Sequence, residues 1–232
     1  LGLVDVPGGV NYQDATFKIN LPTKNAGTFS IFGLGGESHI HFSPESQTKD
    51  NLYSSSDGSV RDRNFKSLTG VIGLSHLYFY NSNTSAKTTF AVSGFSSKYD
   101  EAILEENKAD KPAFYRKNDQ VKYSISHTLN KKFSSKNQLT AGAVADINQL
   151  KLYQDYIKDG DSVLSNLLDI NKTAVLLKGF VNLGHRFSDQ LSTNVGVYVQ
   201  DFTVNNSISI EPRWNIKYQF KNNQSVSFGA GL

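Results

Sequence analysis

The stretch SISIEPRWNIKYQF at residues 207–220 alternates between apolar and polar side chains without an exception. Its apolar set is Ile208, Ile210, Pro212, Trp214, Ile216, Tyr218 and Phe220. Because successive side chains of a strand point to opposite faces, this period predicts a two-sided β-strand. The stretch is longer than the roughly 5 to 6 residues of an ordinary strand, and longer than the roughly 9 to 11 residues with which a tilted strand crosses a bilayer. It therefore indicates an outer-membrane β-barrel.

The composition of the 232-residue chain fits this class of protein and excludes others. Mean hydropathy is -0.39, and no apolar run approaches the roughly 18 residues of a membrane helix. A barrel wall averages to a polar composition, because lipid-facing and lumen-facing residues alternate. The net charge of +3 is spread along the chain, which argues against nucleic-acid binding. The absence of cysteine excludes disulfides, thiolate metal sites and cysteine nucleophiles.

The connections between alternating segments change in length along the chain. Short connections are expected at residues 22–26, 81–85, 132–136, 188–190 and 221–224, a modest one at 204–207, and long ones at 37–68, 100–118 and 153–170. Outer-membrane barrels have short periplasmic turns and long extracellular loops, whereas a soluble sandwich has no reason to keep this rhythm. We therefore predict an all-β antiparallel meander of about ten strands, forming part of a transmembrane β-barrel. Helix-like patches are expected inside the long loops at residues 100–110 and 162–168.

Three groups of side chains have some features of a functional site but lack the rest of the pattern. They are the pair His39 and His41, the acidic group Asp155, Asp159 and Asp161, and the pair Glu105 and Glu106. The histidines lack a third ligand, and the aspartates lack the spacing and final glutamate of a calcium loop. The glutamates lie in a polar stretch with nothing to raise a carboxyl pKa. The sequence therefore predicts no catalytic residue, no metal site, no cofactor and no enzymatic activity.

Residues 10–36, VNYQDATFKINLPTKNAGTFSIFGLGG, carry a resemblance to a known family. The matching motifs are Tyr12-Gln13-Asp14, Phe17-Lys18, Leu21-Pro22-Thr23, Gly27-Thr28-Phe29 and, further along the chain, Glu211-Pro212-Arg213. This set resembles a barrel segment of TonB-dependent outer-membrane receptors, in the subgroup with an N-terminal carboxypeptidase-regulatory-like domain. The specific resemblance covers about a quarter of the chain, and the remainder matches in pattern.

The resemblance implies a plugged barrel of about 22 strands that imports a scarce ligand with energy relayed by TonB. The expected partners are outer-membrane lipid, the rest of the receptor with its plug, TonB through a missing N-terminal region, and an unidentified ligand; nucleic acid is not among them. Residues 1–232 are then a partial β-barrel domain in the bacterial outer membrane, without the plug and the remaining strands. The chain opens on Leu1 without a signal-peptide pattern and ends on strand-like residues 229–232, so we expect an internal piece.

Ligand contacts are expected in the three long loops, although the sequence names no contact residue. Deleting residues 43–64 is expected to abolish uptake and leave the barrel assembled. Two alternatives remain: a complete passive barrel, such as a porin or a structural outer-membrane protein, and a soluble β-barrel or sandwich that binds a ligand. Alternation alone does not choose which face is outside. Strand length and loop rhythm favour Trp214 and Ile216 facing lipid, with Arg213 and Lys217 facing the lumen.

Overall fold

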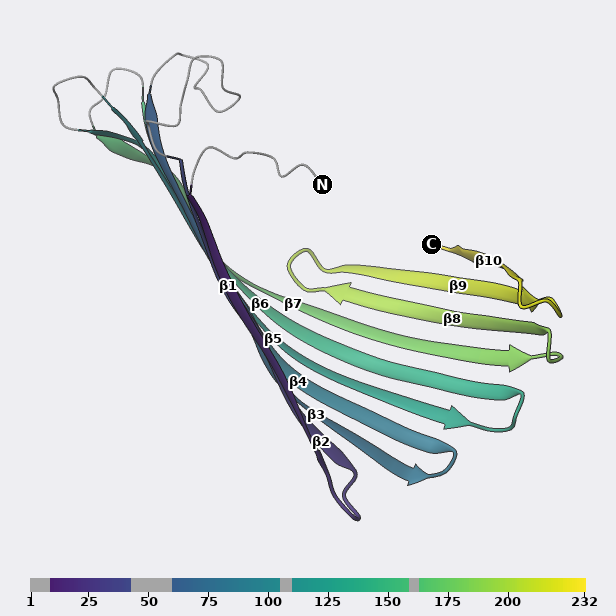
Figure 1. Ribbon diagram of the computed structural model, residues 1–232. Coiled ribbons are helices and arrows are strands. Elements are labelled where there is room, and N and C mark those ends of the chain that lie inside the picture. Colours follow the sequence, from purple (N-terminus) through teal and green to yellow (C-terminus); the bar gives the residue numbers. More distant parts are fainter. Residues whose placement is uncertain (1–8, 43–59, 105–109, 159–162) are drawn as a thin grey trace.

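The chain forms one curved β-sheet in a computed structural model that describes residues 9–42, 60–104, 110–158 and 163–232 (Figure 1). Ten strands follow one another across the sheet in chain order, and each neighbouring pair is antiparallel. They are β1 (Gly9–Pro22), β2 (Thr28–Phe42), β3 (Arg61–Asn81), β4 (Thr84–Ile103), β5 (Lys111–Lys132), β6 (Asn137–Ile157), β7 (Leu164–Arg186), β8 (Leu191–Phe202), β9 (Ser207–Gln219) and β10 (Ser225–Gly231). The predicted all-β antiparallel meander of about ten strands is confirmed.

The short connections lie together at one end of the sheet, along its lower and right margin in Figure 1. They join β1 to β2, β3 to β4, β5 to β6, β7 to β8 and β9 to β10. Because every neighbouring pair of strands is antiparallel, alternate connections must fall at the same end. The prediction that the short hairpins share one end is therefore confirmed.

Serine hydrogen bonds in two of these turns, and a glycine in a third, explain why they are tight. Ser134 Oγ accepts bonds of 3.1 and 3.1 Å from the backbone N–H groups two and three residues later, and Ser188 Oγ does the same at 3.2 and 3.1 Å. Serine hydroxyls close turns in this way. In the β1–β2 turn, Gly27 has φ 79°, and a Cβ there would lie 2.2 Å from the Leu77 carbonyl oxygen. The turn therefore requires glycine.

The predicted extents of the long loops, residues 37–68, 100–118 and 153–170, are wrong. Strand β2 runs on to Phe42 and β3 begins at Arg61, and the strands on both sides of the other two connections are longer as well. The sequence was misleading here because the apolar and polar faces exchange sides along these strands, which interrupts the alternation. Residues 43–59, 105–109 and 159–162 lie outside the described residues.

The helix-like patches are also wrong where the structure describes them, since residues 100–103 and 164–168 are strand. Between β6 and β7, Gln154 pairs with Leu168 and Asp155 pairs with Asn166, so Leu167 is an extra residue in a β-bulge. One extra residue breaks the period of two and makes the apolar spacing look helical. The remainder of each patch lies outside the described residues.

The sheet is a single layer, and its strands differ in length. Strands β3 to β7 have 20 to 23 residues, whereas β8 and β9 have 12 and 13. Leu176 of β7 pairs with Phe202 at the end of β8, so β7 continues for another twelve residues, 164–175, beyond its neighbour. Within the described strands the sheet is open, with β1 and β10 as its edges. None of the described large side chains is fully buried, so the sheet has no hydrophobic core of its own.

Pro212 fits its wall strand without disrupting the β8–β9 ladder. Its carbonyl oxygen accepts a 3.3 Å bond from Leu232, just beyond the last residue of β10. In a strand the nitrogen and carbonyl oxygen of one residue point to the same side, so the missing N–H of Pro212 falls at the end of β10. A proline is tolerated at such a position.

Candidate functional site

The convex face carries an apolar belt next to the short turns, interrupted at Asp201 on β8. The cross-strand register assigns to this face alternate residues within 15–21, 29–35, 70–78, 86–94, 121–129, 139–147, 175–183, 191–199, 208–218 and 226–230. None of these positions is Asp, Glu, Lys or Arg, although the half-buried Asp201 lies on the same face between Leu177 and Ile208. Residues 121–129 extend about 30 Å along their strand, which at a tilt of about 35 to 45° spans about 21 to 25 Å, close to the height of about 25 Å of a barrel's apolar band. We call this surface the belt.

The belt is exposed to the surroundings of the sheet. Ile125 is 52% exposed, Ile208 is 68% exposed and Trp214 is 42% exposed, whereas Ile216 is half-buried. Apolar side chains in such numbers outside a core require an apolar solvent or a partner. Arg213 lies on the opposite face, so the orientation agrees with the prediction that the apolar set faces lipid.

Aromatic rings gather at the lower margin of the belt, beside the short turns. Phe29 and His76 stack with ring centroids 4.3 Å apart, and Tyr78 packs edge-on against Tyr80 at 5.0 Å. On β9, Tyr218 is 4.9 Å from the Phe220 ring. Amphipathic rings are enriched at membrane interfaces, so this row has the composition of an interfacial girdle.

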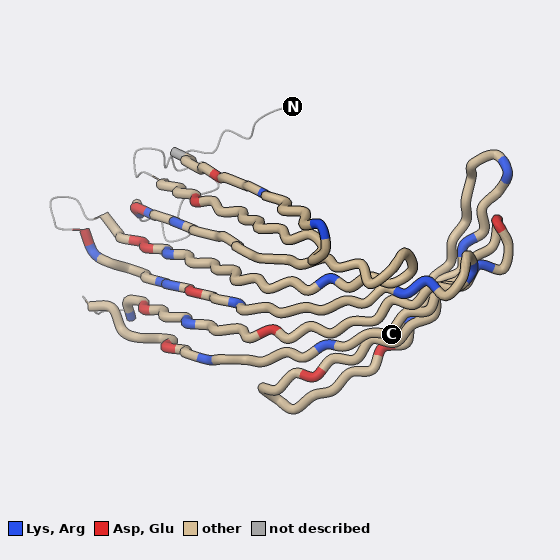
Figure 2. Tube along the Cα trace, turned by 90° about the horizontal axis from the view of Figure 1, so that it is seen from below, with Lys and Arg blue, Asp and Glu red and all other residues tan. Residues whose placement is uncertain are grey.

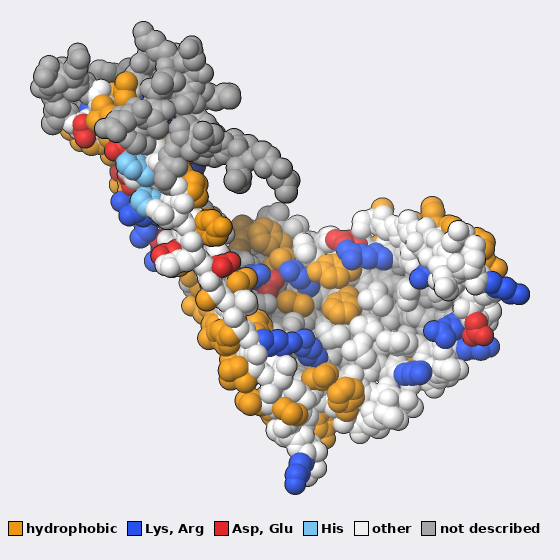
Figure 3. Space-filling view, in the orientation of Figure 1, with side chains coloured by type: hydrophobic (Ala, Val, Ile, Leu, Met, Phe, Trp, Pro, Cys, Tyr) orange, Lys and Arg blue, Asp and Glu red, His pale blue; other side chains and the backbone are white. Residues whose placement is uncertain are grey.

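Behind the belt, the concave face is polar. Figure 3 shows this face over β8 and β9 as mostly white with scattered blue. Asp146, 4% exposed, accepts bonds of 2.8 Å from Lys178 and 2.6 Å from Ser124. Nearer the edge of the sheet, Arg213 bonds to Glu211 at 2.7 Å. Such a face suits an aqueous lumen.

Beyond the belt, the polarity of the two faces is reversed. On the convex face, Lys66, Lys98 and Lys117 are direct cross-strand neighbours, and Lys98 and Lys117 lie 3.4 and 3.3 Å from Asp100 and Asp119. Figure 2 shows such charged residues toward the far ends of the long strands. The concave face at the same level carries Phe65, Phe95, Leu150, Leu152 and Ile170, all half-buried. We call this part of β2 to β7 the extension.

An ion cluster lies on the concave face of the extension. The Glu101 carboxylate accepts bonds from Arg61, from Arg63 Nε at 3.1 Å and from the Tyr99 hydroxyl at 2.6 Å. Burial would raise the pKa of Glu101, but the hydrogen bonds from Tyr99 and Arg61 outweigh it and hold this pKa below its usual range. Burial and the bond to Glu101 raise the pKa of Tyr99. The cluster ties β3 to β4 outside the belt.

A hollow of about 720 Å³ opens on the concave face where the belt gives way to the extension. Its apolar lining comes from β2 to β8 and includes Leu34, Val71, Phe95, Leu150, Ala174 and Phe202. Its polar lining includes Gln120, Lys122, Asn148 and Lys172. We call it the central hollow. Sequence analysis missed these residues because it assigned ligand contacts to loops, whereas the hollow lies on the strands.

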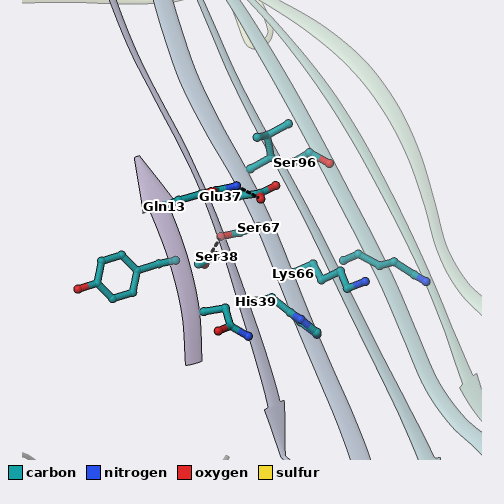
Figure 4. Close-up of a pocket in the computed structure, with 11 residues that line it drawn as sticks. Gln13, Glu37, Ser38, His39, Lys66, Ser67 and Ser96 are labelled. Carbon is teal, nitrogen blue, oxygen red and sulfur yellow. Dashed lines mark hydrogen bonds between the residues drawn. The ribbon is translucent and has the colours of Figure 1, made fainter. Parts of the chain in front are cut away.

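A second hollow, of about 580 Å³, lies at the upper margin of β1 to β4 (Figure 4). Gln13 donates a hydrogen bond to Glu37, and the hydroxyls of Ser38 and Ser67 are 2.8 Å apart. Lys66 lies beside His39 on the neighbouring strand. Both charge signs are present, so this hollow selects no class of ligand.

The candidate side chains that the structure describes form local hydrogen bonds with residues of the neighbouring strand. His39 Nε2 lies 3.4 Å from Asn64, whereas His41 Nε2 lies 2.7 Å from Asp62. Asp155 accepts a bond of 3.0 Å from Asn166. In the described ranges, no group of three or more His, Asp or Glu side chains could hold a metal ion. The candidates Glu105, Glu106, Asp159 and Asp161 lie outside those ranges.

Comparison with known proteins shows similarity of fold and not of sequence. No family model matches the chain, and no curated protein matches it significantly. In the described part of the chain, no helix is long and apolar enough to cross a membrane.

Among solved structures, the chain is similar to the ferric-catecholate import receptor Fiu from E. coli K12, with a TM-score of 0.63 and 9% identity. The similarity covers 96% of this chain and 40% of Fiu, so the chain spans well under half of that neighbour. The chain is also similar to the β domain of the Bordetella autotransporter BrkA, with a TM-score of 0.47 and 11% identity over 96% of this chain and 84% of that domain. It is similar to the translocator domain of the autotransporter NalP from Neisseria meningitidis, with a TM-score of 0.44 and 12% identity over 96% of this chain and 76% of that domain. The similarity to Fiu, together with the ten-stranded antiparallel meander, shows the fold of a bacterial outer-membrane β-barrel, in agreement with the predicted localisation.

Proposed function

We propose that the chain is a wall segment of an outer-membrane import receptor of the TonB-dependent type. In this role the belt contacts lipid, and the concave face lines the path of a scarce ligand. The receptor performs no catalysis, and the plug and the remaining strands belong to other parts of a longer protein. TonB reaches the receptor through that plug region.

The observation that carries this proposal is the change of polarity between the belt and the extension. A passive pore needs the belt and a polar lumen, but it has no need of strands that continue about ten residues beyond the belt with apolar side chains turned inward. An extended, partly apolar inner wall gives a ligand a surface to bind before passage. The similarity in fold to Fiu supports the same function.

Energised uptake is the property that tests this function. The gene is deleted in the source bacterium, and uptake of radiolabelled ferric chelates, cobalamin, oligosaccharides and peptides is measured with and without a protonophore. We expect the deletion to abolish uptake of one of these ligands, and the protonophore to have the same effect in the parent strain. A non-selective loss of permeability that the protonophore does not reproduce would favour a passive barrel instead.

The deletion of residues 43–64 needs a revised boundary. Residues 61–64 belong to β3 and pair with β2 on one side and β4 on the other, so removing them would shorten the wall. Removing residues 43–59 leaves every described strand intact. We expect that shorter deletion to abolish uptake while the barrel still assembles, and unchanged uptake would show that the segment is not needed for ligand capture.

A further inference from the structure

The central hollow combines two surfaces that rarely meet in a water-filled lumen. Its apolar lining is half-buried at Phe95, Leu150 and Phe202, and we call these three side chains the floor of the hollow. In the cross-strand register, Phe95 pairs with Gln120, which in turn pairs with Leu150. The row from β4 to β6 therefore places Phe95 and Leu150 on either side of the exposed Gln120, and these two side chains can contact one face of an apolar molecule.

The polar margin of the hollow is basic. Lys122 on β5 and Lys172 on β7 are both exposed, and in the described ranges no carboxylate lies within ion-pair distance of either ammonium group. Asp146 is the acidic side chain in the neighbouring row, and its field reaches Lys122. It is already satisfied by Lys178 and Ser124, and it is almost fully buried.

Other inward-facing carboxylates do not compensate these lysines. Glu101 is held by its own arginines in the extension, and Glu211 bonds to Arg213 on β9. Asp14 lies on β1, whereas the hollow is lined from β2 to β8. The hollow therefore presents positive charge next to an apolar floor.

We propose that the central hollow binds a small molecule with an apolar body and an acidic group, such as a carboxylate, sulfonate or phosphate. The floor around Phe95, Leu150 and Phe202 contacts the body, and Lys122 and Lys172 contact the anion. This inference rests on the proposed import function and names the chemical class of its ligand. Long lysine stems allow both ammonium groups to reach one anion while their carbon chains lie along the floor.

The test uses the full-length protein in lipid nanodiscs and two probes with the same ring system, naphthalene-2-sulfonate and neutral 2-naphthol. Binding is followed by saturation-transfer NMR, with empty nanodiscs subtracted. We expect the sulfonate to bind saturably, and the double variant Lys122→Met, Lys172→Met to weaken its binding about tenfold while 2-naphthol binding is unchanged. The matched control is Lys217→Met, which removes a concave-face lysine outside the hollow and leaves both probes unaffected.

A second variant keeps the test decisive if the double variant fails to assemble, which heat-modified gel mobility reveals. Ala174→Trp fills the hollow from β7 and should abolish binding of both probes without changing charge. Equal sulfonate binding in the wild type and the lysine variants would overturn the proposal, as would no binding at all to the wild type. If energised uptake is the same in the wild type and in these variants, the proposed ligand class is rejected but the import function is not. If the sulfonate binds as expected but permeation is insensitive to the protonophore, the import function is rejected and the ligand class is kept.

Discussion

The belt and the extension are made by the same strands, yet they present opposite faces to the outside. In the belt, β6 turns Ala145 and Ile147 outward and Asp146 inward. In the extension, the same strand turns Lys151 outward and Leu152 inward. In both regions the strands are extended and successive side chains alternate between the two faces. The regions differ only in which face carries the apolar side chains. The polarity of the outward-facing side chains matches their surroundings, which are lipid at the level of the belt and water at the level of the extension.

This comparison explains why a single layer can be a stable wall. The belt needs lipid on its convex side, because none of its described large side chains is fully buried. The extension resembles a soluble sheet, with a charged outer face and half-buried apolar side chains within. The stability of each region should therefore respond to different substitutions.

Ile125→Arg is expected to have the largest effect, because it puts a charge near the middle of the belt. Ile125 is 52% exposed on the convex face, and a cation at the bilayer midplane costs about 2 to 4 kcal/mol. The measurement is the free energy of unfolding of the full-length protein in lipid vesicles by denaturant titration. The matched control is Leu68→Arg, on the same face beyond the belt and directly opposite Glu37, which should cost less than about 1 kcal/mol. Equal losses for the two variants would mean that the belt does not contact lipid.

The sequence predicts the belt well and the extension poorly, for a physical reason. Short turns and alternating strands such as residues 139–147 are local features of the sequence. The antiparallel meander, and the position of the short turns at one end of the sheet, could therefore be predicted from them. In β6 the apolar phase then changes from Ile147 to Leu150, and that shift could have shown that the strand continues with its faces exchanged. The central hollow could not be predicted, because Phe95, Lys122 and Lys172 meet only through the register of β4 to β7.

Glu101→Ala should destabilise the extension and leave the belt unchanged. It removes the acceptor shared by Arg61, Arg63 and Tyr99, and losing charge-assisted bonds at this half-buried cluster is expected to cost about 1 to 3 kcal/mol. Amide hydrogen exchange should speed up at residues 61–66 and 97–103 and stay the same at 70–78. Asp100→Ala is the control, since its pair with Lys98 is exposed and should contribute less than about 1 kcal/mol. Uniformly faster exchange in both regions would show that the two are one cooperative unit.

The same cluster predicts how the extension responds to pH. The folded state holds the pKa of Glu101 below its usual value, so the folded state binds fewer protons there than the unfolded state. This contribution is complete above the unfolded pKa of about 4.3, and it is lost as the pH falls through the lower folded value. Exchange at residues 97–103, corrected for intrinsic rates, should therefore lose protection below about pH 4. The Glu101→Ala variant should not show that fall; an identical fall in the variant would assign it to another group.

Lys217→Ala is expected to have the smallest effect, and it tests the concave face behind the belt. Lys217 is an exposed side chain between Ser192 on β8 and Ser227 on β10, at the same level as the belt but facing the polar lumen. Water on that side already solvates the ammonium group, so its removal should change the free energy of unfolding by less than about 0.5 kcal/mol. The measurement is the same vesicle titration as for Ile125→Arg. A loss above about 1 kcal/mol would mean that this face is packed against another part of the full-length protein, and the contrast between a lipid-facing and a water-facing side of the belt would fail at β9.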